Sequence, residues 1–348
     1  MPADRRPVSI KQEDLIQSIA DGLQYISYYH PVDYIKNLAA AYEREESPAA
    51  KDAIAQILIN SRMCAEGHRP ICQDTGIVTV FLEIGMDVRW DDATMSVEDM
   101  VHEGVRRAYN HPDNKLRASV LADPAGKRTN TKDNTPGVVN VKIVPGNTVD
   151  VILAAKGGGS EAKSKFAMLN PSDSIVDWVL KTVPTMGAGW CPPGMLGIGI
   201  GGTAEKAMLM AKESLMEDID MYELKQRGPQ NKLEELRIEL CDKINALGIG
   251  AQGLGGLTTV LDDPIFARKN TKDNTPAVVQ MEVVPGNTVD VIVAAKGGGS
   301  ENKSKVYMLN PSDDIVDWVL KTVPTMGAGW CPPGMLGIGV GGTAEKAA

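Results

Sequence analysis

Residues 77–82 read IVTVFL, a run of β-branched, aromatic and aliphatic side chains that begins directly after Gly76. A short apolar run that starts at a glycine predicts a buried β-strand. Two further runs, 138–144 and 149–155, predict two more strands, and the PGN sequence between them indicates a hairpin. This part of the chain is therefore expected to supply a sheet.

Helical patterns precede and follow these strands. Residues 14–27, 31–46 and 47–62 each carry apolar side chains at three- and four-residue spacing, which predicts a helical lead-in over residues 1–63. Because strands and helices then mix without a regular alternation, the predicted fold class is mixed α/β.

Three later helices are predicted together with their capping residues. Ser96 is expected to cap a helix over residues 96–109. Ser172 or Asp173 is expected to cap the helix IVDWVLKTV, and Thr203 the helix AEKAMLMAKESL.

A long internal repeat dominates the organisation of the chain. Residues 128–207 recur as residues 268–347, with about a dozen of some eighty positions changed. A solenoid has at least three shorter units, so this repeat is a duplication of part of a domain. We predict a main domain over residues 1–262 and a partial duplicate of 128–207 over residues 263–348. The simpler interpretation, a duplication without a second function, is preferred to twofold function.

Composition excludes several classes of protein. The chain of 348 residues has a formal net charge of −9 and no dense run of Lys and Arg, so a nucleic-acid-binding protein is not expected. No apolar run is long enough to cross a membrane. The charged N-terminal residues lack the apolar core of a signal peptide, so a cytoplasmic location is expected.

The five cysteines, at positions 64, 72, 191, 241 and 331, are far apart in the sequence. An odd number in a reducing compartment does not favour a disulfide framework, and none of them forms a C-x-x-C zinc motif. Three interpretations stay open: buried thiols, one reactive thiol, or metal ligands that converge from distant loops.

Three loops carry residues suited to chemistry. ICQDTG (71–76) places a thiol beside a carboxylate and an amide, although a buried cysteine next to a turn is the simpler interpretation. KGGGSE (156–161) lets backbone amides approach an anionic oxygen. GWCPPG (189–194) holds Cys191 ahead of two prolines that stiffen the chain.

The glycines at positions 197, 199 and 202 match G-x-G-x-x-G literally. A dinucleotide site requires a strand directly before this motif and an acidic residue after a second strand. A Cys-Pro-Pro loop precedes it here, so a nicotinamide oxidoreductase is a weak alternative.

Taken together, NSRMCAEGHRPICQDTG, KGGGSE, GAGWCPPGMLGIGIGGTAEKA and ALGIGAQGLGG resemble the N-terminal domain of class I fumarases, which are iron–sulfur hydro-lyases. The alpha subunit of L-tartrate dehydratase is similar. The resemblance runs from near the N-terminus to about Asp262. It implies a [4Fe-4S] cluster whose open iron acts as a Lewis acid on a small dicarboxylate. The implied reaction is the reversible hydration of fumarate to malate, a step of the tricarboxylic acid cycle.

The resemblance also implies roles for individual residues. Cys72 and Cys191 match two of the family's three cluster ligands. Asp74 is the candidate for proton transfer, and the candidates for substrate binding are Gln73, Arg117 and Gly158.

The chain departs from the family pattern after about Asp262. The segment with the family's third cysteine is replaced by the second repeat, so Cys331 is the remaining candidate for a third ligand, although its loop matches that of the second. In the family a C-terminal domain or a beta subunit completes the active site, so we expect such a partner, a homodimer, or both. Two alternatives stay open: an L-tartrate dehydratase alpha subunit, and an inactive duplicated fragment without a cluster.

Overall fold

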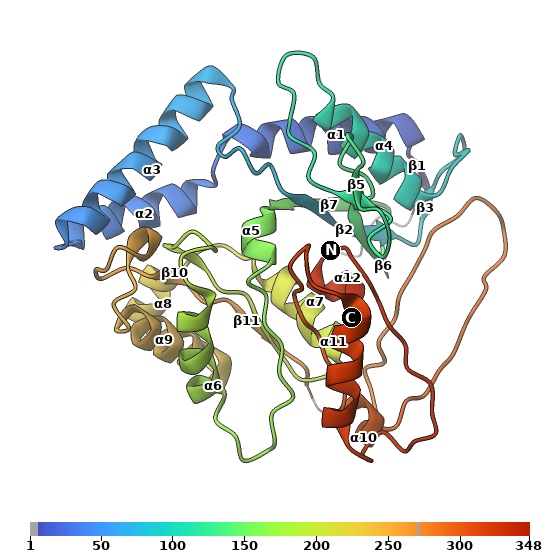
Figure 1. Ribbon diagram of the computed structural model, residues 1–348. Coiled ribbons are helices and arrows are strands. Elements are labelled where there is room, and N and C mark those ends of the chain that lie inside the picture. Colours follow the sequence, from blue (N-terminus) through green and yellow to red (C-terminus); the bar gives the residue numbers. More distant parts are fainter. Residues whose placement is uncertain (1–5, 270–271) are drawn as a thin grey trace. The chain divides into compact units, whose positions relative to one another are not determined.

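The computed structural model of this protein describes residues 6–269 and 272–348 (Figure 1). Helices and strands are mixed along the chain, which confirms the predicted α/β class. Among the described residues, no helix is both long and apolar enough to cross a bilayer.

The chain divides into two compact units, each assembled from separated segments. Unit 1 comprises Met1–His30, Ile59–Gly158 and Ala277–Val291, and unit 2 comprises Pro31–Leu58, Gly159–Pro276 and Ile292–Ala348. The predicted boundary between residues 262 and 263 stays a prediction. Residues 1–5 of the predicted lead-in and residues 270–271 of the second repeat lie outside the described residues.

A three-stranded sheet organises unit 1. β2 (Ile77–Gly85) is its central strand, with β6 (Val138–Val144) parallel on one side and β7 (Val149–Lys156) antiparallel on the other. All three strands were predicted, but the hairpin was wrong. Although β6 and β7 are consecutive, the sheet order β6-β2-β7 puts β2 between them. The turn sequence could not reveal this, because the inserted strand lies more than fifty residues earlier in the chain.

Two helices cover this sheet. α1 (Gln12–Tyr28) and α4 (Val97–Tyr109) pack against each other, and α1 also contacts β7 (Figure 1). Gly104 makes the close helix–helix approach possible, since an ideal Cβ there would lie 2.6 Å from Cβ of Ile19. As predicted, Ser96 caps α4, accepting a hydrogen bond from the backbone N–H of Asp99 at 3.0 Å.

Short strands complete the sheet structure of unit 1. β1 (Val8–Ser9) pairs in parallel with β3 (Val88–Arg89), and β4 (Leu121–Ala122) pairs antiparallel with β5 (Thr129–Asn130). The helix α3 (Pro48–Gly67) ends five residues beyond the predicted helix 47–62.

Unit 2 combines short parallel strand pairs with helices. β8 (Gly194–Met195) pairs with β10 (Val260–Asp262), and β9 (Ile198–Ile200) pairs with β11 (Ile265–Ala267). The helices and 3-10 turns here are α2 (Val32–Arg44), α6 (Ile175–Thr182), η1 (Val183–Met186), α7 (Ala204–Ser214), α8 (Met221–Arg227), α9 (Lys232–Asn245) and η2 (Ala251–Gly253).

Two predicted caps in unit 2 need correction. Ser174, not Ser172 or Asp173, caps α6, and its hydroxyl accepts a hydrogen bond from the backbone N–H of Asp177. Thr203 does occupy the N-cap position of α7, but its side chain makes no capping hydrogen bond. The short helix α5 (Gly158–Glu161), within KGGGSE, precedes both of these helices in the chain.

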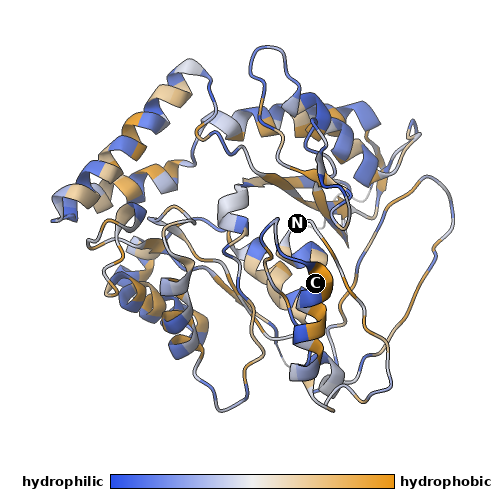
Figure 2. Ribbon diagram, viewed as in Figure 1, coloured by the Kyte–Doolittle hydropathy of each residue, from blue (hydrophilic) through white to orange (hydrophobic). Residues whose placement is uncertain are grey.

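The second copy of the repeat keeps the helices but not the strands of the first. α10 (Gly298–Glu301), α11 (Ile315–Thr322), η3 (Val323–Met326) and α12 (Ala344–Ala347) repeat α5, α6, η1 and the start of α7. Residues 278–296 correspond to β6 and β7 but contain no strand, and Figure 1 draws no arrow there. Several of their hydrophobic residues, coloured orange in Figure 2, are exposed to solvent.

Candidate functional site

The loop that carries Cys72 connects α3 to β2 in unit 1. Cys72 and Gln73 are exposed, and Asp74 is half-buried. The backbone N–H of Asp74 points at Sγ of Cys72 from 3.4 Å, and the same sulfur lies 3.4 Å from Oε1 of Gln73. The thiol, amide and carboxylate predicted from this loop therefore lie at one place on the surface of the unit.

The end of this loop is fixed by hydrogen bonds to its backbone. The hydroxyl of Tyr109 donates to the carbonyl oxygens of Thr75 and Gly76, at 2.8 and 3.0 Å. Nδ2 of Asn134 donates to the carbonyl of Gly76 at 2.9 Å. Burial, aided by the nearby charge of Asp74, raises the pKa of Tyr109, so this side chain stays a neutral donor at physiological pH.

Gly76 itself must be a glycine. Its φ is +89°, and an ideal Cβ there would lie 2.7 Å from the carbonyl carbon of Ala155 in β7. A side chain would therefore push the loop away from the sheet at the point where β2 begins. The position of the Cys72 loop is thus set by the sheet.

Arg117 is held beside the same loop through its backbone. Thr75 Oγ1 donates to the carbonyl oxygen of Arg117 at 2.7 Å and accepts from its N–H at 3.1 Å. The Arg117 residue is exposed. A guanidinium on a backbone tied to residue 75 is well suited to bind a carboxylate near this loop.

The glycine-rich loop after β7 approaches the carboxylate of Asp74. An ideal Cβ on Gly157 would lie 3.1 Å from Oδ2 of Asp74, and one on Gly158 would lie 3.7 Å from it. A side chain at position 157 would therefore crowd the carboxylate. Unit 1 thus brings together five predicted site residues: Cys72, Gln73, Asp74, Arg117 and Gly158.

Cys191 lies in unit 2, on the loop that the sequence predicted to be rigid. It is exposed and has a φ of +59°, between the buried side chains of Trp190 and Pro192. The carbonyl of Pro192 accepts from both the backbone N–H and Nε2 of Gln252, at 2.6 and 2.9 Å. Burial, with a smaller contribution from Cys191, raises the pKa of Tyr34 to about 12.

The five cysteines fall into two groups. Cys64 and Cys241 are buried, and burial raises the pKa of both thiols, that of Cys241 to about 12. Such thiols stay protonated and are poor metal ligands. Cys72, Cys191 and Cys331 are exposed. Cys331 repeats the backbone conformation of Cys191, with a φ of +59°.

The donor chemistry suits an iron–sulfur cluster only in part. Exposed thiols on fixed loops are the ligands that such a cluster requires. Within the described residues, however, no group of three or more His, Cys, Asp or Glu side chains is placed to hold a metal ion. Unit 1 contributes Cys72, and unit 2 contributes Cys191 and Cys331. A complete set of three thiols is therefore not assembled within either unit.

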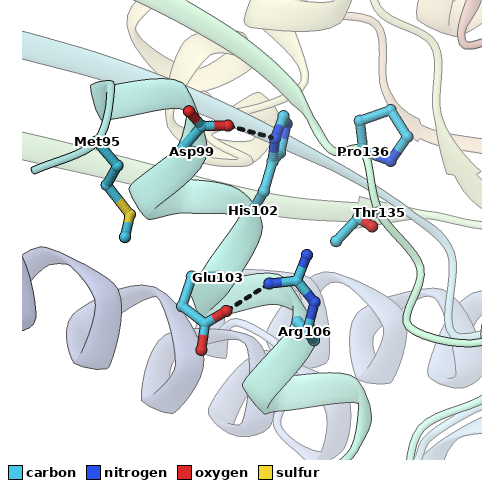
Figure 3. Close-up of a pocket in the computed structure, with 7 residues that line it drawn as sticks. All are labelled: Met95, Asp99, His102, Glu103, Arg106, Thr135 and Pro136. Carbon is cyan, nitrogen blue, oxygen red and sulfur yellow. Dashed lines mark hydrogen bonds and ion pairs between the residues drawn. The ribbon is translucent and has the colours of Figure 1, made fainter. Parts of the chain in front are cut away.

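A separate pocket of about 340 Å³ lies beside α4 and contains none of the candidate site residues (Figure 3). In it, a ring nitrogen of His102 faces Asp99 at 3.9 Å, and Arg106 pairs with Glu103. Nε of Arg106 also donates to Asp133 at 3.1 Å. Because the guanidinium of Arg106 already faces the carboxylates of Glu103 and Asp133, this pocket is a weaker candidate for binding an anion than the Cys72 loop.

Sequence reasoning missed the residues that support the loop. Tyr109 ends a helix and Asn134 sits in an ordinary polar stretch, so neither forms part of a recognisable local pattern. Their hydrogen bonds to residues 75 and 76 connect positions more than thirty residues apart. Only the folded arrangement reveals these contacts.

Known proteins similar to this chain point to one enzyme class. The sequence profile of the family described as "Fumarate hydratase (Fumerase)" matches residues 16–265 and, separately, residues 261–348. The chain is 36% identical over 241 residues to "Putative L(+)-tartrate dehydratase subunit alpha" of Methanocaldococcus jannaschii, covering 67% of this chain and 81% of that protein. It is 25% identical over 250 residues to L(+)-tartrate dehydratase subunit alpha of Escherichia coli K12, covering 71% and 80%.

These similarities identify the chain as a hydro-lyase. Within that class, it belongs to the fumarate hydratase (Fumerase) family. The second profile match also covers the second copy of the repeat, so both copies carry family sequence.

Proposed function

We propose that the protein is the alpha part of an iron–sulfur hydro-lyase that reversibly hydrates fumarate to malate. One observation carries the proposal: a solvent-facing thiol, a carboxylate, an arginine and a glycine-rich backbone meet in one corner of unit 1. A dicarboxylate needs cationic and N–H donors for its two ends and a group that moves a proton at its centre.

The chain's own residues take the following roles in this proposal. Asp74 accepts or returns the proton at the carbon next to the carboxylate. Arg117 binds one carboxylate, and the amide of Gly158 and the side chain of Gln73 orient the substrate. The hydrogen bonds from Tyr109 to the loop backbone hold Asp74 in place during this transfer.

Cys72 and Cys191 are the proposed cluster ligands. Once bound, a [4Fe-4S] cluster with one open iron supplies Lewis-acid chemistry at the substrate hydroxyl. A third donor is needed, and Cys331 has the right chemistry but sits on a copy of the Cys191 loop. We therefore propose that a partner subunit or domain completes the site.

L-Tartrate is the second candidate substrate. The favouring observation is that the relatives above are named as L(+)-tartrate dehydratase alpha subunits. Fumarate, malate and tartrate are all four-carbon dicarboxylates, so the same carboxylate-binding groups serve each of them. The word alpha in these names also supports a beta subunit as the completing partner.

Anaerobic reconstitution of the full chain with iron and sulfide tests the cluster. We expect bound iron, which Cys72→Ser or Cys191→Ser reduces and Cys64→Ser does not, because the Cys64 thiol is buried and protonated. A chain that binds no iron, alone or with a tartrate dehydratase beta subunit, would instead be an inactive duplicated fragment.

Activity assays with the reconstituted protein and a beta subunit then test the roles. Asp74→Asn should retain iron but lower kcat for fumarate hydration by about 10²–10⁴-fold, the usual contribution of a general acid or base. Higher kcat/KM for tartrate than for fumarate would favour the second candidate. Unchanged kcat in Asp74→Asn would remove Asp74 from the mechanism.

A further inference from the structure

Two hydrogen bonds join the two copies of the repeat in a reciprocal way within unit 2. Oε1 of Glu161 accepts from the backbone N–H of Ala344 at 2.9 Å, and Oε1 of Glu301 accepts from the backbone N–H of Ala204 at 2.9 Å. Glu301 and Ala344 lie 140 positions after Glu161 and Ala204. Each of the two hydrogen bonds therefore joins the counterparts of the residues in the other.

The residues that would normally cap these two helices do not do so. Thr203 and Thr343 occupy the N-cap positions of α7 and α12, and neither side chain makes a capping hydrogen bond. Within the described residues, both hydroxyls are buried without a hydrogen-bond partner. Each helix instead receives its acceptor from a glutamate of the other copy, although threonine ordinarily supplies this bond itself.

A buried lysine adds a charged contact between the copies. Nζ of Lys212, in α7, lies 2.7 Å from Oε2 of Glu161 and 3.3 Å from Oε1 of Glu345, an ion pair without hydrogen-bond geometry. All three side chains are less than 7% exposed. α7 also packs against α12, as Figure 1 shows. Only Glu345 belongs to the second copy, so separating the copies would remove this contact and leave Lys212 paired with Glu161 alone.

We propose that Glu161, Ala204 and Lys212 form a self-complementary face, which the second copy occupies from within the chain. A face that pairs by reciprocal contacts is isologous, the type found in twofold-symmetric dimers. The two glutamate–alanine contacts match across a 140-residue offset, and Glu205, the counterpart of Glu345, is also a glutamate. When the second copy is released, the first copy therefore pairs with the same face of another chain.

Two matched double variants of the full chain test this proposal. Glu301→Ala/Glu345→Ala removes the contacts of the second copy and leaves the first copy's face intact. Glu161→Ala/Lys212→Ala also separates the copies but destroys that face. By light scattering over a range of concentrations, we expect the first variant to associate into dimers more tightly than the wild type, by at least about tenfold in dissociation constant. The second variant should not.

Amide hydrogen exchange provides the companion readout on folded protein. Glu161→Ala should speed exchange at Ala344, and Glu301→Ala should speed exchange at Ala204, so each change acts on the opposite copy. Glu161→Gln and Glu301→Gln keep an acceptor oxygen and should change these amides much less. The proposal would be overturned if light scattering gave the two double variants the same molar mass at every concentration. It would also be overturned if the changes in amide exchange were confined to the mutated copy.

Discussion

Residues 138–156 of the first copy and 278–296 of the second have closely similar sequences, but only the first form strands. In the first copy, β2 lies between them and hydrogen-bonds to both. β2 precedes the duplicated segment, so the second copy has no such strand of its own. Val289 is accordingly 88% exposed, whereas its counterpart Val149 is half-buried, and Ile292 is 98% exposed against 45% for its counterpart Ile152.

The helical parts of the copies differ much less. α6 and α11 have the same length, and each begins with a side-chain cap: Ser174 in the first copy and Asp314 in the second. A helix satisfies its backbone hydrogen bonds within its own segment, whereas a strand requires a neighbour. This sequence therefore encodes its helices locally, and its sheet only together with β2.

Of the matched substitutions, replacing the tryptophan before each loop cysteine is expected to give the largest difference in stability loss between the copies. Trp190 is 7% exposed and belongs to a buried cluster with Val179 and Val183. Trp190→Ala should lower the free energy of unfolding by about 3–5 kcal/mol. Trp330 is only half-buried, so Trp330→Ala should lower the free energy of unfolding by at most about 1 kcal/mol. Urea unfolding of both variants measures this, and equal losses would refute the proposed difference in packing.

Asn134 and Asn274 offer a second matched pair. The Asn134 side chain is fully buried, donates to Gly76 and accepts from the backbone N–H of Ser119 at 2.7 Å. Asn134→Ala should cost roughly 1–3 kcal/mol, because it leaves buried groups unsatisfied. Asn274 is exposed, so its replacement by alanine removes no buried hydrogen bond; its φ of +67°, like the +63° of Asn134, adds a backbone cost of about 1 kcal/mol that both changes share. Faster hydrogen exchange in residues 72–76 should accompany only the Asn134 change.

Asp123 and Asp263 lie 140 positions apart and are each followed by proline. In this pair the later residue, not the earlier one, is buried. Asp123 is exposed and accepts from the backbone N–H of Lys127 at 2.9 Å. Asp263 is fully buried, and within the described residues neither of its carboxylate oxygens has a hydrogen-bond partner. Asp263→Ala should therefore stabilise the chain by about 1–3 kcal/mol at neutral pH. Asp123→Ala should destabilise it by about 1 kcal/mol. A loss of stability in Asp263→Ala would show that the carboxylate is satisfied in solution.

The same residue predicts a pH dependence. Burial, with the adjacent charge of Asp262, raises the pKa of Asp263, so the folded chain holds this proton more tightly than the unfolded chain. Its contribution to stability is complete below about pH 4, the unfolded value, and is lost as the pH rises toward the folded pKa. Urea unfolding across this range should show a fall in stability that is smaller in Asp263→Ala than in the wild type.

The smallest expected effect is one that the two copies share. Ser174→Ala and Asp314→Ala each remove an N-cap bond, to the backbone N–H of Asp177 or Asp317. Each should destabilise its own helix by about 1 kcal/mol, because capping is local. Amide exchange in α6 and α11 measures both. A much larger effect in one copy would mean that the two helices do not depend equally on interactions within their own segments.

Residue patterns predicted the elements of this fold better than their partners. The strand at 77–82 and the helices before residue 63 followed from periodicity and bounding residues. The pairing of β6 and β7 did not, because turn chemistry favours a hairpin and says nothing about a distant strand that inserts between them. Likewise, no local pattern separates residues 138–156 from 278–296.

Residue patterns likewise predicted the loops of the candidate site better than the contacts that hold them. The loops at 71–76 and 156–161 were selected for their residue types, and unit 1 places Asp74 against Gly157. The supports from Tyr109 and Asn134 were missed, because each depends on how the chain returns to the start of β2. Whether Cys72 and Cys191 share a cluster stays a prediction.

The position of β2 outside the repeat limits what a copy of the repeated segment can form by itself. A gene segment encoding residues 128–207 carries the flanks of the sheet without its middle. A segment that began before residue 77 would include the middle strand, and one that began before residue 72 would also carry the thiol of the first loop. The smallest segment that could rebuild this sheet unaided is therefore longer than the stretch over which the sequence repeats.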